Sequence, residues 1–147
     1  MKALIQRVSS ARVDVSGNTI GAIDTGIVLL LGVEKTDTTE FVDRMLKKII
    51  NYRIFSDENT KMNLSLLDVK GGLLIISQFT LVAQTNKGTR PGFSSGASPA
   101  HGELIYNDFV KKAKSAVIET ETGEFGADMQ VSLINDGPVT FMFEIDA

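Results

Sequence analysis

Residues 27–33 read Ile27-Val28-Leu29-Leu30-Leu31-Gly32-Val33, a run without a single polar side chain. A strand with one face in water alternates apolar and polar residues, whereas this run is apolar at consecutive positions. It therefore predicts a strand that is covered on both faces. A covering helix is expected over residues 38–51, where Asp37 and Glu40 resemble a capping box and apolar residues repeat at helical spacing. The repeating residues are Phe41, Val42, Met45, Leu46, Ile49 and Ile50.

Other segments rich in Val, Ile and Phe predict the rest of the sheet. Besides 27–33, the expected strands cover residues 3–8, 12–15, 19–23, 73–82, 129–133 and 139–145. The strands before residue 33 are separated by turn residues such as Ser16-Gly17-Asn18, so we expect them to form an antiparallel meander. A second helix should begin after Ser98, with Pro99 in its first turn, and end near Thr120.

Many strands and only two long helices, which do not alternate as repeated βαβ units, indicate an α+β fold. We expect a curved, barrel-like and mostly antiparallel β-sheet with the two helices packed on it. A length of 147 residues fits one domain, 1–147, which is large enough to bury a core without staples.

Composition excludes several classes of site. The chain has no Cys and one His, His101, so it offers no disulfide, no thiolate nucleophile and no His-rich metal cluster. We expect no metal, no cofactor and a cytoplasmic location. No apolar run approaches the ~20 residues of a membrane helix, so we expect no membrane partner. The net charge is −3.

The first candidate site is Ser77-Gln78-Phe79-Thr80, at the end of the most apolar strand and before the polar loop 84–102. A strand end beside a loop combines rigid placement with access. Thr80 is a conceivable nucleophile, with His101 across the loop as its base. The alternative is that Ser77 and Thr80 are ordinary strand hydroxyls and that Phe79 belongs to the core.

The second candidate is Asn135-Asp136-Gly137-Pro138-Val139-Thr140, between the last two expected strands. A Gly-Pro bond at this place is a candidate cis peptide, although a trans turn is the commoner outcome. The third is the loop around Lys87 and Arg90, whose small neighbours would let a nucleic acid backbone approach. Its alternative is a solvated loop.

The first two motifs, in this order, closely resemble those of the D-aminoacyl-tRNA deacylase family. The opening Met1-Lys2-Ala3-Leu4-Ile5-Gln6-Arg7-Val8 and the loop Lys87-Gly88-Thr89-Arg90-Pro91 are similar to that family as well. The resemblance covers nearly the whole chain. It implies a homodimer that hydrolyses the ester between a D-amino acid, or glycine, and the 3′-terminal ribose of tRNA, releasing free tRNA and the amino acid.

The resemblance also implies roles for the motif residues. The catalytic segment 77–80 would line the pocket for the aminoacyl group and the terminal adenosine. In the family the Gly-Pro pair is cis and enters the active site of the other subunit, so Gly137, Pro138, Val139 and Thr140 would form a chiral screen against L-amino acids. Catalysis would depend on main-chain contacts and the 2′-hydroxyl of the RNA, with no protein nucleophile. Lys87 and Arg90 would bind tRNA.

Three other functions remain open at this point. A non-catalytic tRNA-binding module would use the basic loop alone, with the motifs merely shaping the sheet. An esterase of small esters would use Thr80 and His101. A purely structural dimer would need neither the basic loop nor the pair Thr80 and His101.

Overall fold

The sheet is built around one long strand, β1 (Lys2–Val15), in the computed structural model, which describes residues 1–146. On one side, β8 (Gln130–Glu144) pairs antiparallel with almost its whole length. On the other side, β3 (Gly26–Gly32) pairs antiparallel with its first half and β2 (Asn18–Ile23) with its second half. This central position of β1 makes the sheet mostly antiparallel.

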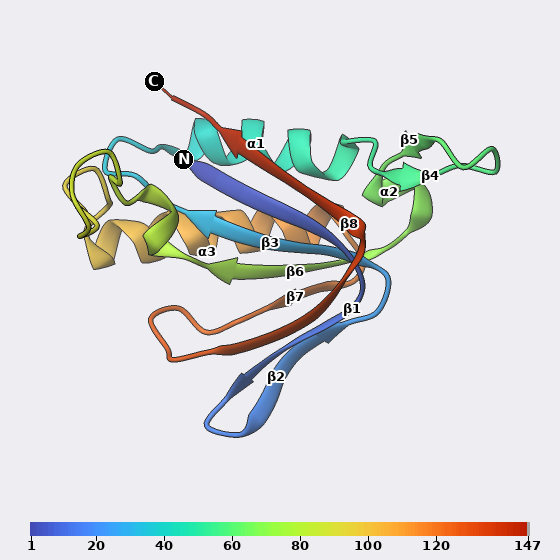
Figure 1. Cartoon of the computed structure of the whole chain (residues 1–147), viewed down its shortest axis with the longest axis horizontal. Helices are drawn as coiled ribbons and strands as arrows, with labels where there is room; N and C mark the ends of the chain where they lie inside the picture. The colour runs from blue at the N-terminus through green and yellow to red at the C-terminus, as the bar shows by residue number, and fades with distance from the viewer. Residues whose placement is uncertain (147) are drawn as a thin grey trace.

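Two parallel strands extend the sheet and curve it toward closure. β6 (Gly72–Ser77) pairs with β3, and β7 (Thr120–Thr122) pairs with β6. Figure 1 shows the sheet bending back so that β7 comes to the same side as β2. A Cβ added at Gly21 of β2 would lie 2.6 Å from the carbonyl oxygen of Thr122, so only glycine allows this approach. The predicted α+β fold with a barrel-like sheet is confirmed.

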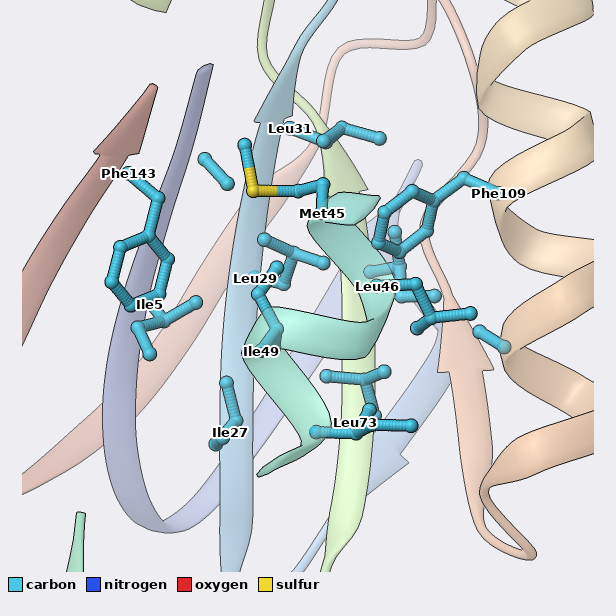
Figure 2. Close-up of a cluster of buried hydrophobic side chains, with 14 of the residues drawn as sticks. Ile5, Ile27, Leu29, Leu31, Met45, Leu46, Ile49, Leu73, Phe109 and Phe143 are labelled. Carbon is cyan, nitrogen blue, oxygen red and sulfur yellow. The ribbon is translucent and has the colours of Figure 1, made fainter. Parts of the chain in front are cut away.

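The apolar run at residues 27–33 is covered on both faces, as predicted. Ile27, Leu29 and Leu31 belong to the main core, and Val28 packs in a second cluster with residues of β6. The main core lies between the sheet and the two long helices, α1 (Thr39–Asn51) and α3 (Pro99–Ala116). Figure 2 shows side chains of α1, such as Met45 and Ile49, directed at the strands.

Four short elements connect these parts. They are β4 (Phe55–Ser56), β5 (Met62–Leu64), α2 (Leu66–Val69) and the 3₁₀ turn η1 (Phe79–Val82). β4 and β5 form a separate small hairpin, and α2 begins with a complete capping box between Ser65 and Asp68. No helix among the described residues is long and apolar enough to cross a membrane.

The predicted antiparallel meander is wrong. Residues 3–8 and 12–15 form one strand, β1, because β8 pairs with it on both sides of Ser9-Ser10 and carries the strand through these polar residues. β3 then pairs with β1 rather than with β2. The two predicted final strands likewise form one strand, β8, with an irregularity at residues 136–139.

Two predicted boundaries and one predicted cap also differ. The strand predicted over 73–82 ends at Ser77, because its neighbour β3 ends at Gly32 and leaves no partner strand beyond that point. The second helix ends at Ala116. Asp37 forms no capping box, because α1 has its N-cap at Thr38 and the carboxylate of Asp37 accepts hydrogen bonds from the amino group of Met1 at 2.8 Å and the N–H of Glu34 at 2.7 Å.

Candidate active site

A cavity of about 500 Å³ opens where β3 and β6 end. Four segments line it: Val33 after β3, residues 76–79 at the end of β6, residues between 97 and 102 at the start of α3, and residues between 125 and 131 on the way into β8. This size is typical of pockets that hold a small organic ligand. Predicted residues Ser77, Gln78 and Phe79 are therefore brought together on one wall.

The local sequence explains why the chain opens a pocket at this point. The N–H of Gln78 donates to the carbonyl of Leu31 at 2.9 Å, the last ladder bond before the chain turns into η1. A Cβ at Gly32 would lie 3.0 Å from side-chain atoms of both Leu81 and Val82, so glycine lets η1 pack closely on the end of β3. The opposite wall starts with Ser98, whose hydroxyl caps α3 by accepting the N–H of His101 at 3.2 Å.

The cavity wall carries few groups for acid–base chemistry. Among the lining residues, all within 1–146, Asp128 alone bears a formal charge, and Ser77 and Ser98 supply hydroxyls. No lining residue is a Lys, Arg, His, Cys or Tyr. Side-chain nucleophiles depend on an adjacent base. Within residues 1–146, no hydrogen bond joins Asp128 to the hydroxyl of Ser77 or Ser98, so the wall holds no assembled nucleophile–base pair.

The structure gives Thr80 and His101 different partners. The Thr80 hydroxyl accepts a hydrogen bond from the side-chain amide of Gln78 and lies outside the cavity lining. The ring Nε2 of His101 lies 2.9 Å from the backbone carbonyl oxygen of Asp37. The structure therefore does not support the threonine–histidine pair of the esterase alternative.

Behind the cavity, Tyr106 ties α3 to the sheet. Its hydroxyl donates to the carbonyl oxygen of Ile75 at 2.8 Å, and its ring packs against Phe125 of the cavity wall with the centroids 5.8 Å apart. Burial raises the pKa of the Tyr106 phenol to about 12. The group is thus a neutral structural donor, which fixes α3 relative to β6.

The Gly137–Pro138 motif forms a bulge in β8. The pairing of β1 with β8 runs from Gln6 opposite Thr140 to Val8 opposite Asn135, so residues 136–139 face Arg7 alone. The Gly137–Pro138 peptide bond is cis, the isomer implied by the resemblance. Both residues are exposed, whereas Val139 is buried.

Two polar side chains hold this bulge. Arg7 Nε donates to the carbonyl oxygen of Asp136 at 2.9 Å, and its Nη1 donates to that of Ile54 at 2.7 Å. Asn135 Oδ1 accepts the N–H of Val139 at 2.6 Å, while its Nδ2 donates to Thr140 Oγ1 at 2.9 Å. The main chain at Gly137 is therefore fixed from both flanks.

The cavity and the bulge lie at opposite ends of the same strands. The bulge is next to Val8, which pairs with Gly26 at the start of β3, whereas Ser77 pairs with Leu31 near the end of β3. Five residues of strand span about 17 Å. In Figure 1 the cavity end is beside the loop that precedes α3, and the bulge is at the sharp bend of β1 and β8. One chain does not bring the two motifs together.

Lys87 and Arg90 occupy the exposed tip of the loop before α3, outside the cavity lining. The base of this loop is closed by two backbone hydrogen bonds between Gln84 and Gly92, at 2.7 and 2.9 Å. The two cations are thus carried beside the cavity on a loop with a fixed base.

Comparison with known proteins identifies the family. A family model described as D-Tyr-tRNA(Tyr) deacylase matches residues 4–144. The chain belongs to this family. Curated relatives named D-aminoacyl-tRNA deacylase include one from Pseudoalteromonas atlantica, 60% identical over 145 residues that cover 99% of this chain and all of the relative. Another, from Pseudomonas aeruginosa, is 56% identical over 144 residues, covering 98% of this chain and 99% of the relative. The predicted family is confirmed, and with it the class of ester-hydrolysing enzyme.

Two solved structures share the fold of this chain. A structure titled as a c-Myc DNA unwinding element binding protein superimposes with a TM-score of 0.95 and 40% identity, covering all of both chains. A second, titled as a probable eukaryotic D-amino acid tRNA deacylase, has a TM-score of 0.84 over 98% of both chains. At 16% identity, the second likeness concerns the fold alone.

Two groups of site residues in this deacylase family member were not expected from the sequence. The cavity wall at residues 125–131, including Asp128 and Met129, lies in a stretch without a motif. A pattern in the sequence points to Arg7. Residues 3, 5 and 7 share one face of the strand, and Ala3 and Ile5 are buried, so Arg7 places a charge on that face. A charge on the buried face of a strand calls for a specific partner.

Proposed function

We propose that this chain hydrolyses the ester bond of D-aminoacyl-tRNA, and of tRNA mischarged with glycine, and that it rejects L-amino acids by means of a partner subunit. The observation that carries the proposal is a ligand-sized cavity with no nucleophile–base pair on its wall, in a member of a tRNA deacylase family. Such a cavity suits a substrate that is already activated and that brings its own hydroxyl.

An aminoacyl ester needs positioning more than it needs a strong nucleophile. The site has to hold the carbonyl, admit a water molecule and stabilise the oxyanion that develops on the carbonyl oxygen. A 3₁₀ turn leaves the first N–H groups without acceptors inside the turn, and η1 begins at Phe79 on the cavity wall. We infer that main-chain N–H groups at residues 79 and 80 serve the oxyanion, and that the 2′-hydroxyl of the terminal ribose assists ester cleavage.

The separation of cavity and bulge supports a homodimer. A screen must stand within contact of the amino acid, yet Gly137 and Pro138 lie about 17 Å of strand away from the end that carries Ser77. A second copy of the chain can supply the bulge to the cavity and receive the same in return, which is the usual isologous arrangement of a dimer. Each active site is then built from two subunits.

A wall of main-chain atoms discriminates by handedness. Gly137 and Pro138 are exposed and carry no long side chain, and Asn135 and Arg7 hold the main chain beside them. We infer that their carbonyl groups face the amino acid. The side chain of an L-amino acid would point into this wall, whereas the hydrogen of a D-amino acid would fit. Glycine has hydrogen in both positions, so the screen would also admit glycyl-tRNA.

Lys87 and Arg90 complete the proposal as contacts to the tRNA backbone. Their loop stands beside the cavity that would receive the 3′ end, and phosphate contacts of this kind position a nucleic acid. Since charged tRNA is used by the translation machinery, a cytoplasmic location remains our expectation.

The test is deacylation by the purified protein. We expect rapid release of D-tyrosine from D-tyrosyl-tRNA, measurable release of glycine from glycyl-tRNA and almost none of L-tyrosine from L-tyrosyl-tRNA. Equal rates for the two enantiomers would contradict the chiral screen. Binding of tRNA without any hydrolysis would favour the non-catalytic module.

The dimer is tested by mixing two inactive variants. A variant with a blocked cavity, Ser77→Trp, and a variant with an altered screen, Gly137→Val, should each lose activity. When the two are refolded together, heterodimers would contain one intact cavity facing one intact screen, so about a quarter of the wild-type activity should return. A mixture as inactive as its parts would contradict the cross-subunit screen.

A further inference from the structure

Two phenylalanine rings stand exposed beside the cavity. Phe79 is 66% exposed and Phe93 is 43% exposed, and their centroids are 5.3 Å apart with an interplanar angle of 44°. Phe79 also lines the cavity, so the pair is continuous with the candidate active site. Large apolar side chains grouped at the edge of a binding pocket mark an interaction surface.

Main-chain contacts fix the position of this aromatic pair. Phe93 follows Gly92, which is tied to Gln84 by two hydrogen bonds, and its own carbonyl accepts the N–H of Gly96 at 3.1 Å. Ser95 is held from two sides, because its hydroxyl donates to Val82 O at 3.0 Å and its carbonyl accepts the N–H of Lys35 at 3.1 Å. A surface ordered in advance loses less conformational entropy when it binds.

The loop that carries Phe93 has charges of one sign. The segment 84–96 contains Lys87 and Arg90 and no Asp or Glu, in a chain whose net charge is −3. Exposed aromatic faces beside cations are the combination by which proteins hold single-stranded nucleic acid, since bases stack on the rings and cations meet the phosphates.

The expected substrate has a base to place at this point. If the cavity holds the amino acid and the terminal adenosine, the nucleotide before that adenosine must lie just outside the cavity mouth. The 3′ end of tRNA is single-stranded, so the base of this nucleotide is free to leave its stack and meet a ring. Phe79 and Phe93 lie at the edge that this nucleotide has to pass.

We propose that Phe79 and Phe93 form a stacking platform for the penultimate base of the tRNA 3′ end, a binding subsite at the mouth of the cavity. The platform rests on the proposed function, because it presumes that the cavity receives the terminal adenosine. It explains how a cavity that contacts only the end of the substrate distinguishes tRNA from a small ester. Ring faces stack with any base, so the platform does not read sequence. A free nucleoside has no penultimate base, so the platform favours RNA over it.

RNA is a better occupant than a second copy of the chain. An interface between protein copies would bury these rings against apolar side chains, whereas the loop around them offers cations and small polar residues such as Thr85 and Ser94. The exposed fractions of the two rings also leave aromatic surface accessible beside the loop.

The first experiment compares two substrates of one enzyme. D-Tyrosyl-tRNA carries the penultimate base, and 3′-O-D-tyrosyl-adenosine lacks it. For Phe93→Ala we expect the ratio of kcat/KM for the tRNA to kcat/KM for the nucleoside ester to fall about tenfold, as loss of one stacking contact predicts. Phe93→Tyr keeps an aromatic face and should restore the ratio. Ile118→Ala, at a fully exposed apolar residue after α3, is the matched control and should leave the ratio as in the wild type.

The second experiment detects the stacked base directly. The probe is an acceptor-stem RNA with D-tyrosine on its 3′ end through a non-hydrolysable amide and 2-aminopurine as its penultimate base. Binding to the wild type should quench the fluorescence, because a stacked 2-aminopurine is dark. Phe93→Ala should remove most of this quenching, and Phe93→Tyr should retain it.

Three results would overturn the platform. An unchanged ratio in Phe93→Ala, while the wild type still hydrolyses D-tyrosyl-tRNA, would leave the proposed function intact and refute the platform. An equal loss on both substrates would mean that Phe93 only shapes the cavity. Dissociation of the protein into monomers in sedimentation velocity, caused by Phe93→Ala, would mean that a second copy covers the rings. Failure of the wild type itself to hydrolyse D-tyrosyl-tRNA would instead refute the proposed function.

Discussion

The two ends of β3 and β6 are held in different ways. At the cavity end, backbone hydrogen bonds close the wall itself, Gln78 to Leu31 and Ala97 to Val33 at 3.1 Å, while the Tyr106 side chain ties the helix behind it. At the bulge end, the side chains of Arg7 and Asn135 bond to the main chain. We therefore expect side-chain substitutions to change the geometry of the bulge more than that of the cavity wall. Under the proposed function, the chemistry would depend on main-chain geometry, whereas the selectivity would depend on a few side chains that keep a bulge in place.

Gly137→Ala should cause the largest loss of activity, because it changes the residue at the centre of the bulge. Gly137 has a φ of +143°, and a Cβ there would lie 2.7 Å from Val139 Cγ2 and 3.0 Å from Val139 N. The backbone has to shift, and misplacing a positioning group by about 1 Å costs ~100-fold in rate. We expect a fall of this order in kcat/KM for D-tyrosyl-tRNA.

The matched control is Gly88→Ala, at a glycine with a φ of +64° and nothing within 4 Å of an added Cβ. This variant also places a side chain at a positive φ, but without a steric contact and on an exposed loop away from the bulge. A Gly137→Ala enzyme with wild-type rate and wild-type preference for the D-enantiomer would contradict the screening role.

Arg7→Ala should loosen the same bulge from its flank. It removes two charge-assisted hydrogen bonds to main-chain carbonyls, of Asp136 and Ile54, each worth ~1.5–3 kcal/mol. We expect the ratio of D- to L-tyrosyl-tRNA deacylation to fall by ~10-fold or more, with a smaller loss in Arg7→Gln, which keeps one donor group. The ratio is the decisive quantity, because a general loss of stability would lower both rates alike.

The sequence predicted the parts of this molecule that depend on local pattern. The consecutive apolar residues at 27–33 required cover on both faces, and the helical repeat after them supplied it on one. The pairing of strands that are far apart in the sequence was harder to predict. Ser9-Ser10 looked like a break in a strand, yet β8 bonds across them, and no pattern within residues 2–15 announces a partner from the other end of the chain.

The candidate site divides in the same way. Ser77, Gln78 and Phe79 were predicted because a strand ends beside a loop, and all three line the cavity. Thr80 belongs to the same motif but lies outside the lining, since the 3₁₀ turn rotates it away and its hydroxyl bonds to Gln78. The wall at residues 125–131 escaped prediction because its shape depends on where β7 and β8 sit, which is a property of the closed sheet.

Tyr106→Phe tests the rigidity of the cavity end through pH. The phenol is buried, and its pKa is raised from 10.0 to about 12, so the folded state holds its proton where the unfolded state loses it. The wild type should therefore keep this contribution to stability below pH 10 and lose it as the pH rises toward 12, by about 3 kcal/mol.

The phenylalanine variant should lack this alkaline loss, and it should be less stable near pH 7 by ~1 kcal/mol for the missing bond to Ile75. Urea unfolding at a series of pH values measures both quantities. Parallel curves for the two proteins between pH 9 and 11.5 would mean that the phenol titrates normally, and that α3 is not held as tightly as its contacts indicate.

Neutralising Lys87 and Arg90 should weaken the cavity end as a receptor for RNA and leave its chemistry in place. For Lys87→Gln with Arg90→Gln we expect tRNA affinity to depend less steeply on salt, with the log–log slope reduced by about 2 if each residue meets one phosphate. Filter binding between 50 and 200 mM salt measures the slope. An unchanged slope would show the loop to be merely solvated.

Thr80→Ala should have the smallest effect of all, although it changes a residue of the most recognisable motif. Its hydroxyl has a neighbour in Gln78 and no basic partner, and His101 is engaged with the carbonyl of Asp37. Without a base, a threonine hydroxyl is a weak nucleophile, so the variant should keep kcat within ~10-fold of the wild type, and His101→Ala should do the same.

Thr80→Ser, which retains a hydroxyl, is the control that separates the hydroxyl from the packing of the methyl group. If Thr80→Ala were inactive and Thr80→Ser active, catalysis would depend on that side chain. The cavity end would then resemble the bulge end in its reliance on single side chains, and the contrast between the two would fail.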